Sequence, residues 1–257
     1  MAMSAERVNV WLGAGKPHHV VRDVNLQLAQ GKVLSIIAPS GAGKTTLLYF
    51  LAGILPIESK SNYLNFSFFG QDYNTFSKKE RVGFAFQRQL FFEWSTIIES
   101  IVQYQKASGL APDKRLIKQL LSGLGIAEAE DFRPSEMSGG MLARAALARA
   151  MSISPRLLLL DEPFYGLDEL SRSRCLQVIR DYVSTSKCLA ILVSHHLTDA
   201  AAISDKIMVL SSSPMTLLRE VDLTPNEKSR SLQEATKIAE DVRALAVKLW
   251  LSNDSRR

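Results

Sequence analysis

Apolar residues alternate with polar ones near the start of the chain and then gather into short continuous runs. Val24, Leu26 and Leu28 occupy every second position, which is the period of a half-buried strand. Residues 33–37 are almost wholly apolar and rich in β-branched side chains, so they predict a buried strand. Residues 44–53 follow after a glycine-bearing loop and have a helical pattern. We therefore expect a strand, a loop and a helix in that order.

Three further apolar runs, 81–86, 157–160 and 189–193, predict more buried strands. A helix is expected over about 170–182, between the last two runs. Strands that alternate with helices in this way are typical of a parallel sheet. The chain is therefore predicted to be an α/β protein.

Helical spacing of apolar residues dominates the stretch from about 92 to 150. One helical face there carries Leu116, Leu120, Leu121 and Leu124. We interpret this stretch as a helical subdomain inserted in the α/β core. A small strand after Pro214 and an amphipathic helix over about 232–251 are expected to complete the chain.

Composition narrows the classes of protein. The 257 residues are long enough for one large domain with a modest insertion, and the net charge of +5 comes from scattered Lys and Arg, so no nucleic-acid partner is expected. Cys175 and Cys188 form no CxxC pair and are expected to be buried free thiols.

No apolar run approaches the roughly 20 residues of a spanning helix, and the first residues lack the apolar stretch of a signal peptide. A role at a membrane would therefore require other chains.

The loop from Ala38 to Thr45 satisfies most of the phosphate-binding pattern G-x-x-x-x-G-K-[ST] between a strand and a helix. Backbone N–H groups of such a loop can wrap a β-phosphate, aided by the positive end of the helix dipole. The amides expected to do so belong to Ser40, Gly41, Ala42, Gly43 and Lys44. The Lys44 ammonium would lie between the β- and γ-phosphates, the Thr45 hydroxyl would bind Mg²⁺, and Thr46 could bond the α-phosphate. The alternative is an ordinary glycine turn before a helix.

Ala38 stands where the pattern has its first glycine. A methyl group is the smallest possible addition, so we expect strain of at most a few tenths of a kcal/mol if φ is negative there.

Two carboxylates end the apolar run at 157–160 and are predicted to lie at the carboxyl end of a buried strand, where ligands bind in open α/β sheets. Asp161 would hold Mg²⁺ through water, and Glu162 would act as the general base for the attacking water. An exposed Asp-Glu turn is the alternative interpretation.

Together these motifs resemble the ATPases of the ATP-binding-cassette (ABC) transporter family, over about residues 5 to 220. Residues 38–46 are similar to its Walker A motif, and residues 157–162 to its Walker B motif. Gln87 resembles the Q-loop glutamine of the family. The sequence Met-Ser-Gly-Gly-Met at 137–141 is similar to the L-S-G-G-Q signature. The resemblance implies a P-loop NTPase core of mostly parallel strands flanked by helices, with an N-terminal antiparallel β subdomain. It implies an ATPase domain over 5–225, with the helical subdomain at about 92–150 inserted, and a helical tail over 226–257.

The resemblance also implies roles for residues in and beyond the phosphate loop. Catalytic roles fall to Glu162, His195 and Gln87, and the Mg²⁺ ligands would be Thr45, Gln87 and Asp161. Trp11 would stack on the adenine of ATP. Asp168 resembles the D-loop aspartate at the seam between two subunits. His196 stands where the family usually has an acidic residue, and no role is assigned to it.

In the signature, Ser138 is expected to cap a helix and leave the N–H groups of Gly139 and Gly140 facing an anion. The resemblance implies that these groups meet the γ-phosphate held by a second copy, in a head-to-tail dimer. The alternative is simply a serine-capped helix. Met141 replaces the family's glutamine, and Ala143 replaces a polar residue, so the sequence leaves the rate of turnover open.

The segment from Gln87 to Trp94 resembles the docking surface of importers of the nitrate, taurine and sulfonate type. Phe91, Phe92 and Trp94 would form a groove for a short helix of a transmembrane permease subunit, or else pack inside the helical subdomain. Residues 211–214, Ser-Ser-Ser-Pro, are also similar to a motif of that group.

The function implied is that of an ATP-hydrolysing subunit at the cytoplasmic face of the cell's inner membrane, coupling dimer closure to import of a small anion. A separate solute-binding protein would belong to the complex. The alternatives are a degenerate cassette that serves as an ATP-binding scaffold, and an ABC ATPase acting on DNA repair or the ribosome.

Overall fold

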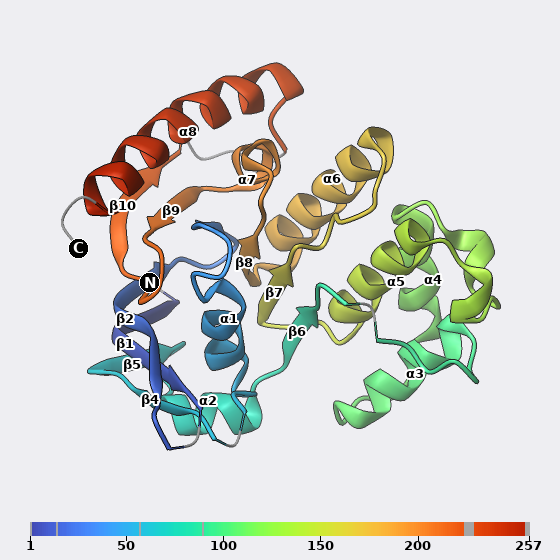
Figure 1. The fold of residues 1–257 in the computed structure, drawn as a ribbon. Helices are drawn as coiled ribbons and strands as arrows, with labels where there is room; N and C mark the ends of the chain where they lie inside the picture. Colours follow the sequence, from blue (N-terminus) through green and yellow to red (C-terminus); the bar gives the residue numbers. More distant parts are fainter. Residues whose placement is uncertain (1, 14, 57, 89, 224–228, 255–257) are drawn as a thin grey trace.

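Two sheets organise the chain in the computed structural model, which describes residues 2–13, 15–56, 58–88, 90–223 and 229–254. One sheet is antiparallel and lies at the N-terminal side of the molecule (Figure 1). It contains β1 (Met3–Leu12), β2 (His18–Leu28), β4 (Lys60–Asn62) and β5 (Asn65–Phe68). Its order is β2-β1-β4, and β5 also pairs with β1. The N-terminal antiparallel subdomain expected from the sequence is thus present.

The second sheet has the order β10-β9-β3-β8-β7-β6, in which only β10 runs antiparallel to its neighbour. Its strands are β3 (Val33–Ile37), β6 (Val82–Ala85), β7 (Leu157–Asp161), β8 (Leu189–Val193), β9 (Lys206–Leu210) and β10 (Leu217–Asp222). Every residue of β3, β7 and β8 is buried, which is why their sequences are nearly continuous apolar runs, broken by Ser35 in β3 and ended by Asp161 in β7. Asp161 pairs in register with Val193, so the ends of β7 and β8 lie side by side.

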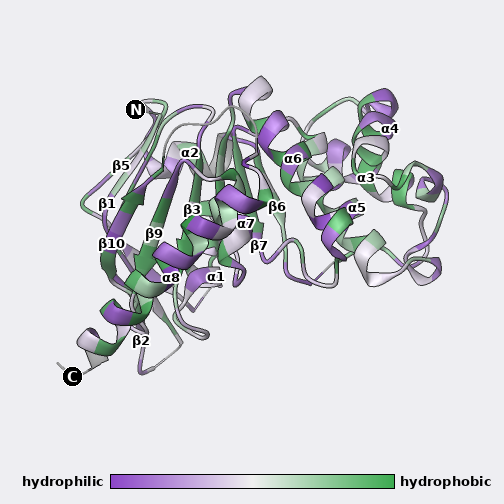
Figure 2. Cartoon of the chain, turned by 90° about the horizontal axis from the view of Figure 1, so that it is seen from above, coloured by the Kyte–Doolittle hydropathy of each residue, from purple (hydrophilic) through white to green (hydrophobic). Residues whose placement is uncertain are grey.

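Side chains of the parallel strands alternate between two cores, one on each face of the sheet. Leu158 and Leu160 point into the core on the side of the helical insertion, whereas Leu157 and Leu159 point into the core shared with the antiparallel sheet. Helix α1 (Lys44–Ala52) lies between the two sheets and fills the second core (Figure 1). Figure 2 shows that these inner strands are hydrophobic and that purple, hydrophilic residues lie on the outer helices.

The helical insertion between β6 and β7 extends to one side of the molecule (Figure 1). It contains α3 (Ile97–Ala107), α4 (Lys114–Gly123), α5 (Gly139–Ser152) and two short 3₁₀ turns (Ala127–Ala129 and Pro134–Glu136). Of the four leucines expected on one face, Leu120, Leu121 and Leu124 are buried, whereas Leu116 is half-buried at the edge of the core.

The remaining helices are α2 (Tyr73–Lys79), α6 (Glu169–Ser186), α7 (Leu197–Ile203) and α8 (Leu232–Asp254). Helix α6 is longer than the helix predicted over 170–182 from the apolar pattern. Asp168 caps its N-terminus, and Lys187 ends it in a left-handed conformation. The last helix packs its small residues against the core, and Trp250 Nε1 donates to the Leu210 carbonyl at 2.8 Å. The expected domain boundary at 225 and 226 lies outside the described residues.

Cys175 and Cys188 are buried free thiols, as predicted. Burial raises the pKa of the Cys175 thiol to about 12, so this group is not a reactive thiolate near neutral pH. In the described part of the chain, no helix is long and apolar enough to span a membrane.

Gly83 in β6 lies where a side chain has no room. A Cβ there would lie 2.3 Å from the Ala150 carbonyl oxygen and 2.9 Å from Cγ of Pro155, and a backbone oxygen cannot move aside cheaply. Gly83→Ala should cost about 2 kcal/mol of unfolding free energy and lower Tm by about 4 to 8 °C, measured by calorimetry. Gly123→Ala in α4 is the matched control, because the atom nearest to its Cβ would be Cγ2 of Val178 at 3.9 Å, an ordinary contact distance. An equal loss in both variants would contradict the prediction.

Candidate active site

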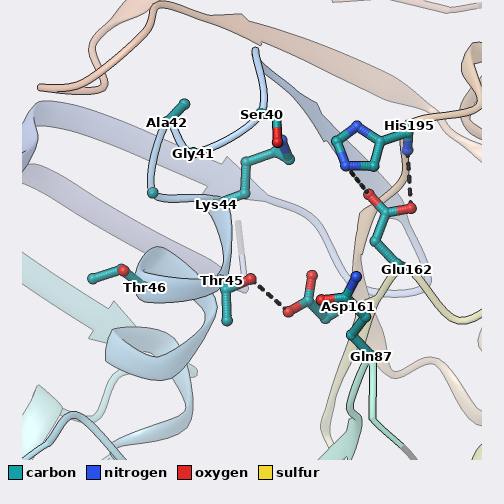
Figure 3. A pocket seen from close by; sticks show the side chains of 11 residues that line it. Ser40, Gly41, Ala42, Lys44, Thr45, Thr46, Gln87, Asp161, Glu162 and His195 are labelled. Atoms are coloured by element: carbon teal, nitrogen blue, oxygen red, sulfur yellow. Dashed lines mark hydrogen bonds and ion pairs between the residues drawn. The ribbon is translucent and has the colours of Figure 1, made fainter.

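A cavity of about 320 Å³ lies at the carboxyl ends of β3, β7 and β8, beside the N-terminus of α1. Polar groups dominate its wall, and they come from segments more than 100 residues apart in the sequence. The lining residues are Ser40, Gly41, Ala42, Gly43, Lys44, Thr45, Thr46, Gln87, Asp161, Glu162 and His195. Figure 3 shows Lys44 and Thr45 on one side of this space and Gln87, Asp161, Glu162 and His195 on the other. The structure thus brings together the residues of the phosphate loop and the carboxylates that follow β7.

The phosphate loop needs glycine at two positions. Gly41 and Gly43 adopt φ of 72° and 110°, which disfavour other residues, and a Cβ on Gly43 would lie 2.3 Å from Cγ1 of Val20 in β2. Ala38 has no positive φ, so its methyl group causes no backbone strain of that kind. The loop therefore tolerates the departure from the usual motif.

Lys44 is the buried cation of the cavity. Its side chain donates to the carbonyl oxygens of Ala38 and Pro39 at 2.9 and 3.1 Å. Burial lowers its pKa, and the nearby Glu162 and Asp161 carboxylates oppose this effect. Only 7% of the residue is exposed, and these two contacts hold the charge within the loop at the N-terminus of α1, where a bound phosphate can meet it.

Thr45 and Asp161 form an oxygen pair opposite the loop. The Thr45 hydroxyl donates to Asp161 Oδ2 at 2.7 Å, and Asp161 is 3% exposed (Figure 3). Burial raises the pKa of Asp161, which means that its charge lacks full compensation within the chain. Hard oxygen donors of this kind suit Mg²⁺, and the Gln87 amide adds a further oxygen to the same wall. The residues present therefore fit a magnesium ion.

Glu162 and His195 form the other polar pair. The His195 backbone N–H donates to Glu162 Oε2 at 3.1 Å, and His195 Nε2 lies 3.3 Å from Oε1 (Figure 3). Glu162 adopts a φ of 48° and its N–H donates to the Val193 carbonyl, so the backbone turns sharply and points the carboxylate into the cavity. Burial raises the pKa of Glu162 and lowers that of His195, and Lys44 lowers the latter further. A carboxylate beside a neutral imidazole can accept a proton from water.

Five of the predicted residues do not line this cavity. Trp11 in β1 stacks on His19 of β2 with ring centroids 4.4 Å apart. His19 directly precedes Val20, the β2 residue next to Gly43 of the phosphate loop. Asp168 caps α6, since its Oδ1 accepts from the Ser171 N–H at 2.9 Å. Ser138 caps α5 by accepting from the Met141 N–H at 3.2 Å, as expected. At the start of that helix lie Gly139 and Gly140.

Arg144 is a residue that sequence reasoning missed. Its Nε donates to the Gly140 carbonyl at 3.2 Å and its Nη1 to the Gly125 carbonyl at 2.9 Å. It therefore ties the first turn of α5 to the loop after α4. The only available signal was a basic residue four positions after Gly140, which by itself indicates nothing specific.

A phosphate-binding loop, a carboxylate pair after a buried strand and a polar histidine in one cavity define a P-loop nucleotide-binding domain. Residues 21–165 match the family described as ABC transporter. The aliphatic sulfonates import ATP-binding protein SsuB 1 of Pseudomonas aeruginosa is 32% identical over 205 residues, covering 78% of this chain and 80% of that protein. The chain belongs to the ABC transporter family.

Other relatives are longer. The sulfate/thiosulfate import ATP-binding protein CysA of Escherichia coli is 32% identical over 81% of this chain, and that of Yersinia pseudotuberculosis is 31% identical over 82%. The chain spans 58% of the length of each of these proteins. Among solved structures, the ATP-binding cassette MJ0796, a dimer in a post-hydrolysis state with ADP and Pi, superposes with a TM-score of 0.72 at 20% identity. This match covers 87% of the chain and all of MJ0796, and it supports the fold.

Proposed function

We propose that this chain binds and hydrolyses ATP as the energising subunit of a membrane importer. The observation that supports this most directly is the position of Glu162. Its largely buried carboxylate, in a side chain that is 12% exposed, shares one cavity with the phosphate loop and with the Thr45–Asp161 pair. A scaffold that only bound ATP would need the loop and not a carboxylate aimed into the same space.

In the proposed reaction, Lys44 and the loop amides hold the β- and γ-phosphates. Thr45, Asp161 and Gln87 would hold Mg²⁺, which neutralises phosphate charge when bound. Glu162 accepts a proton from the attacking water, and its raised pKa makes it a better base than an exposed glutamate. His195 keeps that carboxylate in place through its backbone N–H and orients the γ-phosphate with its ring.

A second copy would complete the site. Ser138 and Gly139 are exposed at the start of α5, where unpaired N–H groups and the helix dipole favour an anion. We propose a head-to-tail pair in which these amides contact the γ-phosphate of the other copy, with Asp168 at the seam and Trp11 stacked on adenine. Closure then depends on the γ-phosphate and is lost after hydrolysis.

An exposed aromatic surface supports a membrane partner. Phe92 and Trp94 stack with centroids 5.0 Å apart while 45% and 73% exposed, whereas Phe91 packs on the core with Arg149 above its ring. Phe91 thus follows the packing alternative, and the other two remain free for docking. We propose that a short helix of a permease subunit binds here, at the cytoplasmic face of the inner membrane. Gln89, in the same segment, lies outside the described residues.

Trp94→Asp is expected to remove the permease subunits from the purified complex, because a charge replaces the largest apolar contact of the surface. Leu64→Asp is the control, since Leu64 is 62% exposed in the antiparallel region. Co-purification in detergent, with the membrane subunits identified by mass spectrometry, measures the outcome. Retention of the same subunits by Trp94→Asp would refute the docking assignment.

For the cargo, we propose a small anion of the sulfonate or sulfate type, delivered by a separate solute-binding protein. The support is the similarity to the ATP-binding proteins of sulfate/thiosulfate and aliphatic sulfonate import. Phosphate release by the purified chain with Mg·ATP tests the proposal as a whole. Steady turnover that rises when the permease subunits are added is the expected result. ATP binding without turnover, in either setting, would favour the scaffold alternative, and turnover stimulated by ribosomes or DNA would favour a non-transport ATPase.

A further inference from the structure

A buried run of polar contacts behind His195 has no part in the proposed chemistry. Asp199 in α7 is 1% exposed and accepts a hydrogen bond from Ser194 Oγ at 3.2 Å. Its other oxygen lies 3.9 Å from Nη1 of Arg172 in α6. Ser194 itself is 4% exposed. A carboxylate with so little exposure depends on such partners, so these contacts join α7 to the end of β8 by a hydrogen bond and to α6 by a longer ion pair.

The backbone of His195 is held from both sides. Its own N–H donates to Glu162, and the next N–H, of His196, donates to Ser194 Oγ at 3.1 Å. Because the Ser194 hydroxyl accepts from His196 and donates to Asp199, its orientation is determined. The two peptide groups that flank the imidazole are therefore attached to the catalytic carboxylate and to the Ser194–Asp199 pair.

Arg172 links this arrangement to the loop at 166–168. It lies in the first turn of α6, where its N–H donates to the Asp168 carbonyl at 2.9 Å. Its ion pair with Asp199 is at the outer limit of distance, and within the described part of the chain Arg172 Nε is buried without a hydrogen-bond partner. A small displacement of the start of α6 can therefore lengthen or shorten the pair.

We propose that Arg172, Asp199 and Ser194 are positioning residues that transmit the position of the loop at 166–168 to His195. The proposal rests on the proposed function, since it assumes that His195 acts on bound ATP. When a second copy displaces Asp168, the first turn of α6 carries Arg172 with it, and Asp199 and Ser194 shift the peptide groups around the imidazole. Hydrolysis in one site is thereby made sensitive to contact at the seam.

Kinetics test this role. Ser194→Ala, Asp199→Asn and Arg172→Met are expected to lower kcat about tenfold with KM for ATP changed less than about twofold, because they misplace His195 without removing a contact to ATP. Arg172→Lys should recover part of the loss, since it keeps the charge. Asp181→Asn, exposed on α6, is the control. In a His195→Ala background the further loss should shrink to below about twofold. Losses that multiply independently of His195 would overturn the proposal.

Amide hydrogen exchange tests the linkage without ATP. In the nucleotide-free chain, Arg172→Met is expected to raise the exchange rate of the His196 amide about tenfold, and Asp181→Asn to leave it unchanged. An unchanged rate in Arg172→Met, or a rise shared by all of α6 and α7, would overturn the linkage. This measurement needs no turnover, so it still tests the linkage if the wild-type chain fails to hydrolyse ATP. Such a failure would contradict the proposed function and not the linkage.

Discussion

Glu162→Gln is expected to lower ATP turnover by about three orders of magnitude while leaving the affinity for ATP within about twofold. The amide keeps the size of the carboxylate and can still accept from the His195 N–H, so the backbone turn at this position is retained. It cannot take a proton from water. Phosphate release and ATP binding, measured on the same purified preparation, separate the two effects.

The same variant also examines the proposed pairing of two copies. With ATP uncleaved, the γ-phosphate persists, so Glu162→Gln should form a dimer in Mg·ATP that the wild type forms only transiently. Adding Gly139→Trp to this variant places a bulky side chain at an exposed position of the α5 N-terminus, where no neighbour lies within 4 Å in one copy. We expect the dimer to be lost in light scattering, and its persistence would count against contact between the α5 cap and ATP. If Glu162→Gln hydrolyses ATP at the wild-type rate, Glu162 is not the general base.

The parallel strands and the phosphate loop were predictable because burial on both faces leaves an unmistakable apolar run before a glycine loop. The strand predicted at 33–37 has the bounds of β3, and the one at 189–193 those of β8. Strand β9 was missed, because Lys206 opens a run of only five residues directly after Asp205. The short elements β4, β5 and α2 were missed for a similar reason: their stability comes from pairing with β1 and from aromatic packing around Phe76.

Within the site, sequence motifs indicated which residues carry chemistry but not how they are held. The sequence around Asp199 does not indicate that this residue supports the backbone at His195, because its contact with Arg172 joins residues 27 positions apart. The same holds for Arg144, whose partner at Gly125 is 19 positions away. Contacts of this kind follow from tertiary packing, and a single sequence contains no period or motif that records them.

Lys44→Ala is expected to weaken ATP binding itself, by about 100-fold, which is ~2.7 kcal/mol. The ammonium is buried against the loop. Among the described residues that line the cavity, Lys44 is the only Lys or Arg, so its removal leaves two carboxylates facing the phosphates without that positive charge. Because Lys44 also donates to the Ala38 and Pro39 carbonyls, Tm must be compared with the wild type to exclude a collapsed loop.

Lys118→Ala, on the exposed face of α4, serves as the control. Calorimetric titration with Mg·ATP gives the affinity. If Lys44→Ala binds as the wild type does, the loop amides alone hold the nucleotide, and the division of labour between a binding lysine and a hydrolytic Glu162 is wrong.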